Sequence, residues 1–403
     1  MTAYSSIQAS KRIDLLDILR GLALLGVLIT NIVMDYSTES APAGLSEWTT
    51  GLVKALTEGS FYPLYSILFG IGFAVWMDKS MKRDGGIWLF AWRSCILFFF
   101  GYILIVLIEG NPIFLRYSLL SIPLLLFYKA SPKILLAGAI IFLLLGVLHQ
   151  PISRQLQSMR SPEVQTRKMN QIKKSVQAYQ LALSKAKKSK KFSDYAKART
   201  ILFSNQLKMI YTLLDKALPV IFSMFLLGMY CWRKCFFTSV DKHLSFWRKI
   251  FWLSLIIGLG GQLVIFTSRL METKGIFIPN QDLLKYSELI LNPVLTFFYI
   301  SLIVLIAYNF QSKPNTVLNG FKAAGRMSLT NFFLQYVIIV ILMYPYGLGF
   351  NGLLFSYYLL LLAFAIFFLQ VLLSIFWFKC FSYGPIEWLW RSLTYMKFQR
   401  IKK

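Results

Sequence analysis

The stretch Asp14-Leu-Leu-Asp-Ile-Leu-Arg-Gly-Leu-Ala-Leu-Leu-Gly-Val-Leu-Ile-Thr-Asn31 decides the fold. It is long and apolar enough to cross a membrane as a helix, yet it contains Asp17 and Arg20. A charge at the centre of a membrane helix costs about 2.5–3.5 kcal/mol on insertion scales, so such residues are usually paired, face a bundle interior or serve a function. The stretch therefore predicts a spanning helix with a polar face.

The composition extends this reading to the whole chain. Hydrophobic residues make up 57% of its 403 residues, whereas ordinary globular proteins have about 45–50%. Long Leu, Ile and Phe runs without strict alternation favour helices over barrel strands. We therefore predict an all-α, polytopic membrane helical bundle with about ten spans. The expected spans are residues 14–34, 61–77, 94–108, 113–128, 134–149, 217–232, 250–268, 288–309, 327–345 and 352–378.

A long polar insertion divides these spans into two halves. The expected parts are a membrane half (1–149), the insertion (150–216), a second membrane half (217–380) and an amphipathic basic tail (381–403). The insertion has 15 Lys and Arg against three acidic residues, and its apolar residues recur at three- and four-residue steps. This pattern predicts a basic helical hairpin with a turn at Ser189–Ser193.

The charge of the hairpin suggests a partner. It could dock onto anionic lipid headgroups or cell-wall polymers, or it could simply be a solvated surface module. Nucleic acid is not expected as a partner, because the chain contains no binding motif for it. The oligomeric state stays open.

The distribution of Lys and Arg predicts the orientation. These residues collect in the loops on the side of the two termini, whereas the short loops of the other side contain Lys54, Arg269, Lys274 and Lys285. Cytoplasmic loops carry the excess of Lys and Arg, so we expect a multi-pass protein of the cell membrane with both termini in the cytoplasm. The insertion then lies outside, which its length permits, since long loops cross largely regardless of charge.

The first span carries one polar face. Arg20 and Asn31 are eleven residues apart, which leaves only about 20° of rotation between them on a helix. Asp17 and Arg20 are three residues apart and can pair, and Asp14 lies one turn earlier. An arginine at this depth could bind phosphates; alternatively, the face is a structural ion pair.

Other polar residues mark candidate cavity walls. In the ninth expected span, Arg326 and Thr330 are four residues apart, as are Asn331 and Gln335. Glu109, Asn111 and Arg116 form a candidate outer cluster. These groups could line a substrate path or make interhelical hydrogen bonds. The glycines of Phe69-Gly-Ile-Gly-Phe73 are typical of close helix packing.

Common catalytic and metal-binding motifs are missing from the sequence. It has only two histidines, His149 and His243, and its four cysteines do not cluster. No metal is therefore expected. There is also no phosphate-binding glycine loop and no HExxH or GxSxG motif.

Four motifs together resemble a known family. They are Arg12-Ile-Asp-Leu-Leu-Asp-Ile-Leu-Arg-Gly, Leu64-Tyr-Ser-Ile-Leu-Phe-Gly-Ile-Gly-Phe, Gly325-Arg-Met-Ser-Leu-Thr-Asn and Gly384-Pro-Ile-Glu-Trp-Leu-Trp-Arg. In order and spacing they resemble the YeiB-like bacterial membrane proteins. The last motif, with Gly384, Pro385, Glu387, Trp388 and Arg391, is the most specific. The first is also similar to the transmembrane acyltransferase superfamily, which includes the lysosomal heparan glucosaminide acetyltransferase.

This resemblance implies transfer of an acyl group from a cytoplasmic donor, such as acyl-coenzyme A, to an acceptor outside. Arg12, Asp17 and Arg20 would bind the donor, and Asn31 would orient the acyl carbonyl. The heparan enzyme has its catalytic histidine shortly after the matching asparagine, whereas residues 35–60 here contain none. Family members also commonly carry Gly-Asp where this chain has Gly110-Asn111. Asp35 is then the nearest candidate for a general base.

Two other functions fit the same residues. A transporter or exporter of a small amphiphile could use the polar faces of the first and ninth spans as its path. A non-catalytic receptor or immunity-like protein would explain the missing histidine.

Overall fold

The computed structural model describes residues 13–38, 44–80, 86–108, 111–158, 162–211, 217–273, 281–310 and 315–403. Over these ranges the chain is helical and forms no strand, apart from one isolated bridge between Phe381 and Lys402. The prediction of an all-α polytopic bundle is confirmed.

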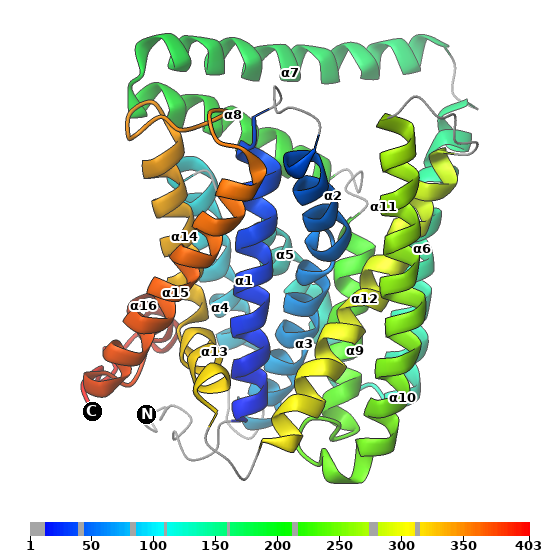
Figure 1. Ribbon diagram of the computed structural model, residues 1–403, viewed down its shortest axis with the longest axis vertical. Helices are drawn as coiled ribbons and strands as arrows, with labels where there is room; N and C mark the ends of the chain where they lie inside the picture. Colours follow the sequence, from blue (N-terminus) through cyan, green and yellow to red (C-terminus); the bar gives the residue numbers. More distant parts are fainter. Residues whose placement is uncertain are drawn as a thin grey trace.

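Helix α1 (Asp14–Tyr36) is the centre of the bundle (Figure 1). It packs against α2, α3, α12, α13, α14 and α15, and Leu19, Leu24 and Leu28 are completely buried. We call the end of the bundle where α1 begins the terminal end, because α16 and the C-terminus also lie there (Figure 1). The opposite end is the hairpin end.

The first half of the chain contains one helix that the sequence analysis missed. Its helices after α1 are α2 (Leu45–Thr57), α3 (Phe61–Ser80), α4 (Gly86–Ile108), α5 (Ile113–Leu124) with a 3₁₀ turn η2 (Leu125–Phe127), and α6 (Pro132–Ser158). Residues 35–60 were expected to be a loop, but α2 occupies much of this stretch. This threonine-rich segment is compatible with a helix, because the hydroxyl groups of Thr49, Thr50 and Thr57 donate hydrogen bonds to backbone carbonyls one turn earlier.

The second half follows the hairpin. Its elements are α9 (Ala217–Arg233), η3 (Asp241–His243), α10 (Leu244–Ser254), a π turn η4 (Leu255–Leu259), α11 (Gly260–Thr273), α12 (Gln281–Asn309), α13 (Thr316–Arg326), α14 (Ser328–Met343), α15 (Ser356–Cys380) and α16 (Pro385–Tyr395). Every expected span falls on helical elements of the two halves, although 113–128 covers α5 and η2, and 250–268 extends over α10, η4 and α11.

The number of spans remains approximate. In the described part of the chain, seven helices are long and apolar enough to cross a membrane, and eight if α13 and α14 together form one bent span. Two shorter apolar helices, 113–127 and 217–233, coincide with the fourth and sixth expected spans. The axes of α13 and α14 differ by 85°, so the chain breaks at Met327, where a continuous span was expected to begin.

Two helix pairs approach closely at glycines. A methyl carbon at Gly325 of α13 would lie less than 3.0 Å from the Asp17 carbonyl oxygen of α1, and one at Gly21 would clash with Phe321. Gly70 of α3 meets the Phe225 carbonyl of α9 in the same way, which confirms the packing expected for that glycine. Gly72 differs, because a methyl carbon there would meet open space.

The insertion forms the expected pair of helices. Helix α7 (Pro162–Ser189) and helix α8 (Phe192–Tyr211) lie across the hairpin end (Figure 1). They are joined at Lys190, whose positive φ of 55° ends α7 at the predicted turn. Arg199 ties α8 to the bundle: it is 2% exposed and donates to the Leu107 carbonyl and to the Tyr346 hydroxyl, at 3.3 and 2.9 Å.

Candidate functional site

A cavity of about 790 Å³ lies at the terminal end of the bundle. Its walls come from α1, α3, α4, α5, α9, α13, α14 and α16, so it draws together segments from both halves of the chain and the tail. The wall is charged in one part and aromatic in another. This polarity fits an elongated ligand with an anionic head and a less polar chain.

The charged part of the wall contains an excess of cations. Four arginines and one lysine line it, against three carboxyl groups. They are Arg20, Arg93, Arg326, Arg391 and Lys79, with Asp17, Asp78 and Glu387. The predicted pairing of Asp17 with Arg20 is confirmed, with 2.6 Å between the Arg20 Nη1 and Asp17 Oδ1 atoms. Asp17 is buried and holds Arg20 in place, rather than facing a donor phosphate itself.

Arg93 is the cation that best fits an anion site. Its guanidinium carbon lies 3.9 Å above the ring of Trp390, and among the described residues no carboxylate lies within ion-pair distance of it. A cation in a protein wall without a counter-charge is costly, so an anionic ligand would relieve this cost. Arg93 was not singled out from the sequence, although its place just before an apolar run could have drawn attention to it.

Aromatic rings fix two more of these arginines. The guanidinium of Arg326 stacks on Phe378 at 4.1 Å, and that of Arg391 stacks on Tyr383 at 4.4 Å. Stacking sets the plane of a guanidinium, and its N–H donors lie in that plane in a fork that matches phosphate oxygens. The arrangement therefore favours phosphate over a single point anion.

Glu387 plays a different part in the wall, because it closes the N-terminus of α14. Its Oε1 accepts from the backbone N–H groups of Leu329 and Thr330 at 2.6 and 3.2 Å, and its Oε2 accepts from the Thr330 hydroxyl at 2.5 Å. Desolvation raises the pKa of Glu387 above its usual 4.5, although these hydrogen bonds oppose the rise. Gly384 is required beside it, since a methyl carbon there would touch the carboxylate.

The remaining family-motif residues shape α16. Pro385 occupies its first turn, where no backbone N–H is needed. Trp388 donates from its indole N–H to the Gln399 carbonyl at 2.6 Å and stacks on Phe398. The motif thus orders the tail that carries Glu387, Trp390 and Arg391 to the cavity.

The aromatic part of the wall leads to Asn31. Tyr62, Tyr65, Phe69 and other rings line this part of the cavity. The Tyr62 hydroxyl donates to the Asn31 Oδ1 at 3.0 Å, and the Asn31 amide donates to the Tyr336 hydroxyl at 2.7 Å. Asn31 itself does not line the cavity, but it contacts the wall through Tyr62, which was not singled out from the sequence.

The other predicted residues of the first span lie away from this wall. Asp14 pairs with Lys322 of α13 at 2.5 Å and is half exposed. Asp35 lies one turn after Asn31, at the exposed end of α1, and is close enough to interact electrostatically with Tyr62. Arg12 lies outside the described residues.

The expectation that Arg326 and Thr330 lie one turn apart on the same helix was wrong. Arg326 ends α13 and Thr330 belongs to α14, so the 85° bend directs them apart: Arg326 lines the cavity and Thr330 bonds to Glu387. Asn331 and Gln335 are fully buried and bond to α15, through Ser374 at 3.0 Å and Gln370 at 2.9 Å. They make interhelical hydrogen bonds and do not line this cavity.

The expected outer cluster is described only in part, because Glu109 lies outside the described residues. Arg116 is partly buried and interacts electrostatically with Tyr62 and Tyr117. The Asn111 backbone hydrogen-bonds the Tyr336 hydroxyl. Both residues therefore lie beside the tyrosines that hold Asn31.

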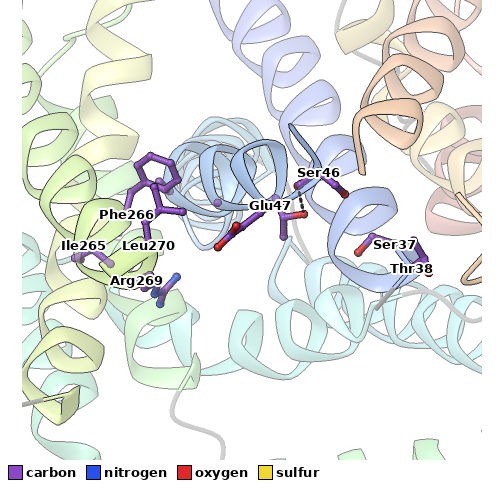
Figure 2. A pocket seen from close by; sticks show the side chains of 11 residues that line it. Ser37, Thr38, Ser46, Glu47, Ile265, Phe266, Arg269 and Leu270 are labelled. Atoms are coloured by element: carbon purple, nitrogen blue, oxygen red, sulfur yellow. Dashed lines mark hydrogen bonds between the residues drawn. The ribbon is translucent and has the colours of Figure 1, made fainter. Parts of the chain in front are cut away.

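A second, smaller pocket of about 290 Å³ opens beside the hairpin end of α1. Figure 2 shows Ser37, Thr38 and Glu47 on one side of it and Phe266 and Arg269 of α11 on the other. Its hydroxyls and its acidic and basic groups suit a small polar molecule.

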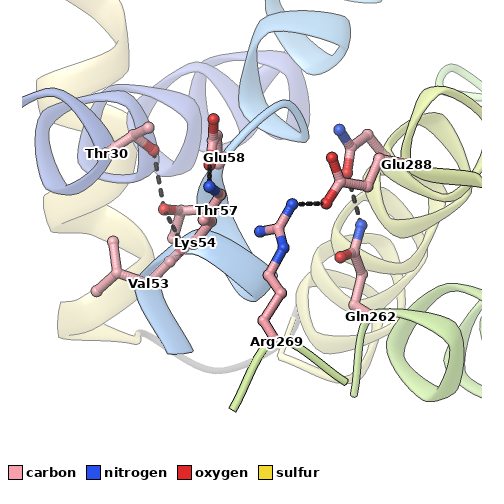
Figure 3. Close-up of polar contacts among 9 residues, drawn as sticks. Thr30, Val53, Lys54, Thr57, Glu58, Gln262, Arg269 and Glu288 are labelled. Carbon is pink, nitrogen blue, oxygen red and sulfur yellow. Dashed lines mark hydrogen bonds and ion pairs between the residues drawn. The ribbon is translucent and has the colours of Figure 1, made fainter. Parts of the chain in front are cut away.

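Partly buried polar contacts join the helices around this pocket (Figure 3). Arg269 forms an ion pair with Glu288, and Gln262 donates to Asn292 at 2.6 Å, so both contacts join α11 to α12. Thr30 of α1 donates to Thr57 of α2 at 2.9 Å. These contacts hold the helices around the pocket at fixed separations.

The two histidines lie outside both cavities. His243 keeps its Nδ1 3.0 Å from the Ser239 carbonyl and contacts the edge of Phe236, while His149 lies on α6. Within the described ranges, no three His, Cys, Asp or Glu side chains come together to form a metal site.

Comparison with known proteins supports the resemblance to the YeiB-like family. Residues 231–397 match the family described as "Protein of unknown function (DUF418)". The chain is 29% identical to the protein YxaH of Bacillus subtilis, over all of this chain and 99% of the relative. It is 25% identical to a 39.9 kDa protein from the amylase 3′ region of Bacillus acidopullulyticus, over 96% of this chain and 95% of that protein.

A shorter similarity concerns YeiB of Escherichia coli, which is 45% identical over 74 residues, or 17% of this chain and 18% of YeiB. No solved structure matches. The resemblance to YeiB-like proteins is confirmed by these matches.

Proposed function

We propose that the protein is a membrane-bound acyltransferase whose donor binds in the cavity at the terminal end. The observation that carries this proposal is the polarity of the cavity wall, with stacked arginines in one part and aromatic rings leading to the Tyr62–Asn31–Tyr336 network in the other. A donor with a phosphate-bearing head and a long, less polar arm matches both parts.

Acyl-coenzyme A fits these residues and, when bound, supplies a thioester-activated acyl group. Arg20, Arg93 and Arg391 would hold its phosphates through in-plane N–H donors. The aromatic wall would exclude water from the arm. The cavity volume lies within the range of about 300–1,000 Å³ that is usual for ligand sites.

The tyrosine network can assist the transfer itself. The Tyr62 hydroxyl can move its hydrogen bond from Asn31 to an acyl carbonyl oxygen, where it would stabilise the developing negative charge. Asn31 and Tyr336 are then positioning residues. The acceptor O–H or N–H attacks the acyl carbon, the carbon–sulfur bond breaks, and the acceptor proton goes to a base, for which Asp35 is our candidate.

The sides of the membrane follow from the Lys and Arg distribution. The donor cavity would open to the cytoplasm with the two termini, and the hairpin end would face outward. The acceptor would enter from the hairpin end, where the pocket beside Glu47 and Arg269 offers polar groups to a hydroxyl- or amine-bearing molecule.

Binding of acetyl-coenzyme A to the purified, detergent-solubilised protein tests the donor site. Arg93→Gln removes a cation with no carboxylate partner among the described residues, and a hydrogen bond to a charged group is worth about 1.5–3 kcal/mol. We therefore expect its Kd to rise by roughly 10- to 150-fold. The matched control is Arg248→Gln, an exposed arginine of α10 outside the cavity, which should leave the Kd unchanged. Absence of binding to the unsubstituted protein would refute the proposal.

A second measurement separates transfer from transport. In vesicles with acetyl-coenzyme A labelled in its acetyl group, an acyltransferase releases free coenzyme A and moves the label to an acceptor or, by transfer to water, to acetate. A transporter instead accumulates its cargo unchanged. Tyr62→Phe should lower the release of coenzyme A at least tenfold while it leaves the Kd for the donor within about twofold. If donor binding falls as much as turnover, Tyr62 is part of the binding site and the assigned role is wrong.

A further inference from the structure

Helix α7 carries a cationic surface that neither cavity uses. Five of its lysines are exposed, and in the described part of the chain none of them has a carboxylate within 4.0 Å. They are Lys173, Lys174, Lys185, Lys187 and Lys188. The charge continues through the turn, where Lys190 and Lys191 are also exposed.

The nearest described carboxylate does not neutralise this surface. Asp194 accepts a hydrogen bond from Ser189, which lowers its pKa, and lies 3.7 Å from Lys197 of its own helix. Like charges so close together repel one another. An anionic partner would relieve that repulsion along the whole helix.

The packing of α7 places this surface away from the bilayer. Helix α7 packs on α8, and α8 in turn packs on α4, so α7 is the outermost layer of the hairpin end (Figure 1). A helix that lies in a membrane interface needs one continuous apolar face. The exposed apolar residues Met169, Val176 and Leu181 do not form one, because Leu181 is rotated by about 140° from Val176 and about 120° from Met169.

The cationic surface of α7 suits a phosphate polymer without bases better than it suits a single-stranded nucleic acid. Proteins that bind single-stranded nucleic acids stack bases on exposed aromatic rings. The only aromatic residue of α7 is Tyr179, which is partly buried. From Lys173 to Lys188 the helix extends about 22 Å at 1.5 Å per residue, with two of the lysines at one end of this length and three at the other. A ligand that contacts both groups must therefore be extended.

We propose that α7 binds an extended inorganic polyphosphate chain on the hairpin side of the membrane. The lysines would contact the phosphate groups along the polymer, and α8 with its buried Arg199 would hold α7 in place. This proposal does not depend on acyl transfer.

Binding of fluorescent inorganic polyphosphate to the full-length protein in phosphatidylcholine nanodiscs tests the proposal. The test variant replaces with Gln the five exposed lysines of α7 defined above. The control variant replaces with Gln five exposed lysines outside the hairpin, Lys129, Lys133, Lys242, Lys249 and Lys397. Because all these side chains are exposed, both variants should fold.

We expect the Kd of the α7 variant to rise at least tenfold at 150 mM salt and that of the control to change less than threefold. The slope of log Kd against log salt should fall by about 3.5, at roughly 0.7 per phosphate contact. An unchanged Kd in the α7 variant would overturn the proposal. So would tighter binding of the unsubstituted protein to RNA, or to phosphatidylglycerol vesicles, than to polyphosphate.

Discussion

Gly325→Ala probes the contact on which the charged wall of the cavity depends. The added methyl carbon would lie less than 3.0 Å from the Asp17 carbonyl oxygen, which belongs to backbone and cannot rotate away. Overpacking of this kind costs about 1–3 kcal/mol, and the higher helix propensity of Ala returns at most about 1 kcal/mol. Because no flexible side chain can move to make room, we expect a net loss of about 2 kcal/mol in the free energy of unfolding.

The matched control is Gly72→Ala, which adds the same methyl group on α3 where it meets open space. It should keep or raise stability by up to about 1 kcal/mol. Denaturant titration of both variants in mixed micelles, followed by tryptophan fluorescence, measures the difference. If Gly325→Ala is as stable as Gly72→Ala, helices α1 and α13 do not meet at the separation described, and the placement of Arg20 and Arg326 in one cavity wall loses its basis.

Three further outcomes follow from the same structure. Gly72→Leu should fill part of the donor cavity and weaken acetyl-coenzyme A binding at least tenfold, whereas Gly260→Leu, which also meets open space but outside the cavity, should leave binding unchanged. Glu387 has a raised pKa in the folded state, so protonation of this carboxyl group favours the folded protein. This contribution to the free energy of unfolding is complete below the unfolded pKa of about 4.5, and it is lost as pH rises through the folded pKa. As pH rises above about 4.5, the unfolding midpoint of the unsubstituted protein should therefore fall relative to that of Glu387→Gln. Plots of the two midpoints against pH that run parallel would contradict this. Arg199→Met should loosen α8 and speed its hydrogen exchange, because two hydrogen bonds to the bundle are lost, while exposed Lys197→Met should not; equal exchange in the two variants would show that Arg199 does not hold the hairpin.

Features that depend on local sequence could be predicted. The apolar runs gave the helices, because length and hydropathy alone determine whether a segment can cross a bilayer. The pairing of Asp17 with Arg20 followed from their spacing on one helix, and the hairpin followed from its apolar period.

Features that depend on contacts between distant segments could not be predicted. The break at Met327 is stabilised by Glu387, nearly sixty residues later in the chain, which satisfies the N–H groups that the break exposes. The cavity wall likewise needs α16 beside α4, where Trp390 meets Arg93. Asn31 was singled out by its residue type, but its hydrogen bond with Tyr62 depends on the packing of α1 against α3.

The closure of α14 by Glu387 also bears on how the protein is made. Helix α14 is synthesised well before Glu387, so its N-terminus has no carboxylate partner until α16 leaves the ribosome. Unsatisfied backbone groups are costly in the membrane, and synthesis proceeds at about 5–20 residues per second. The cavity wall at Glu387 can therefore be completed only about 3–12 s after the N-terminus of α14 has been made. A chain that stops before α16 would have its other helices in place but an unfinished cavity.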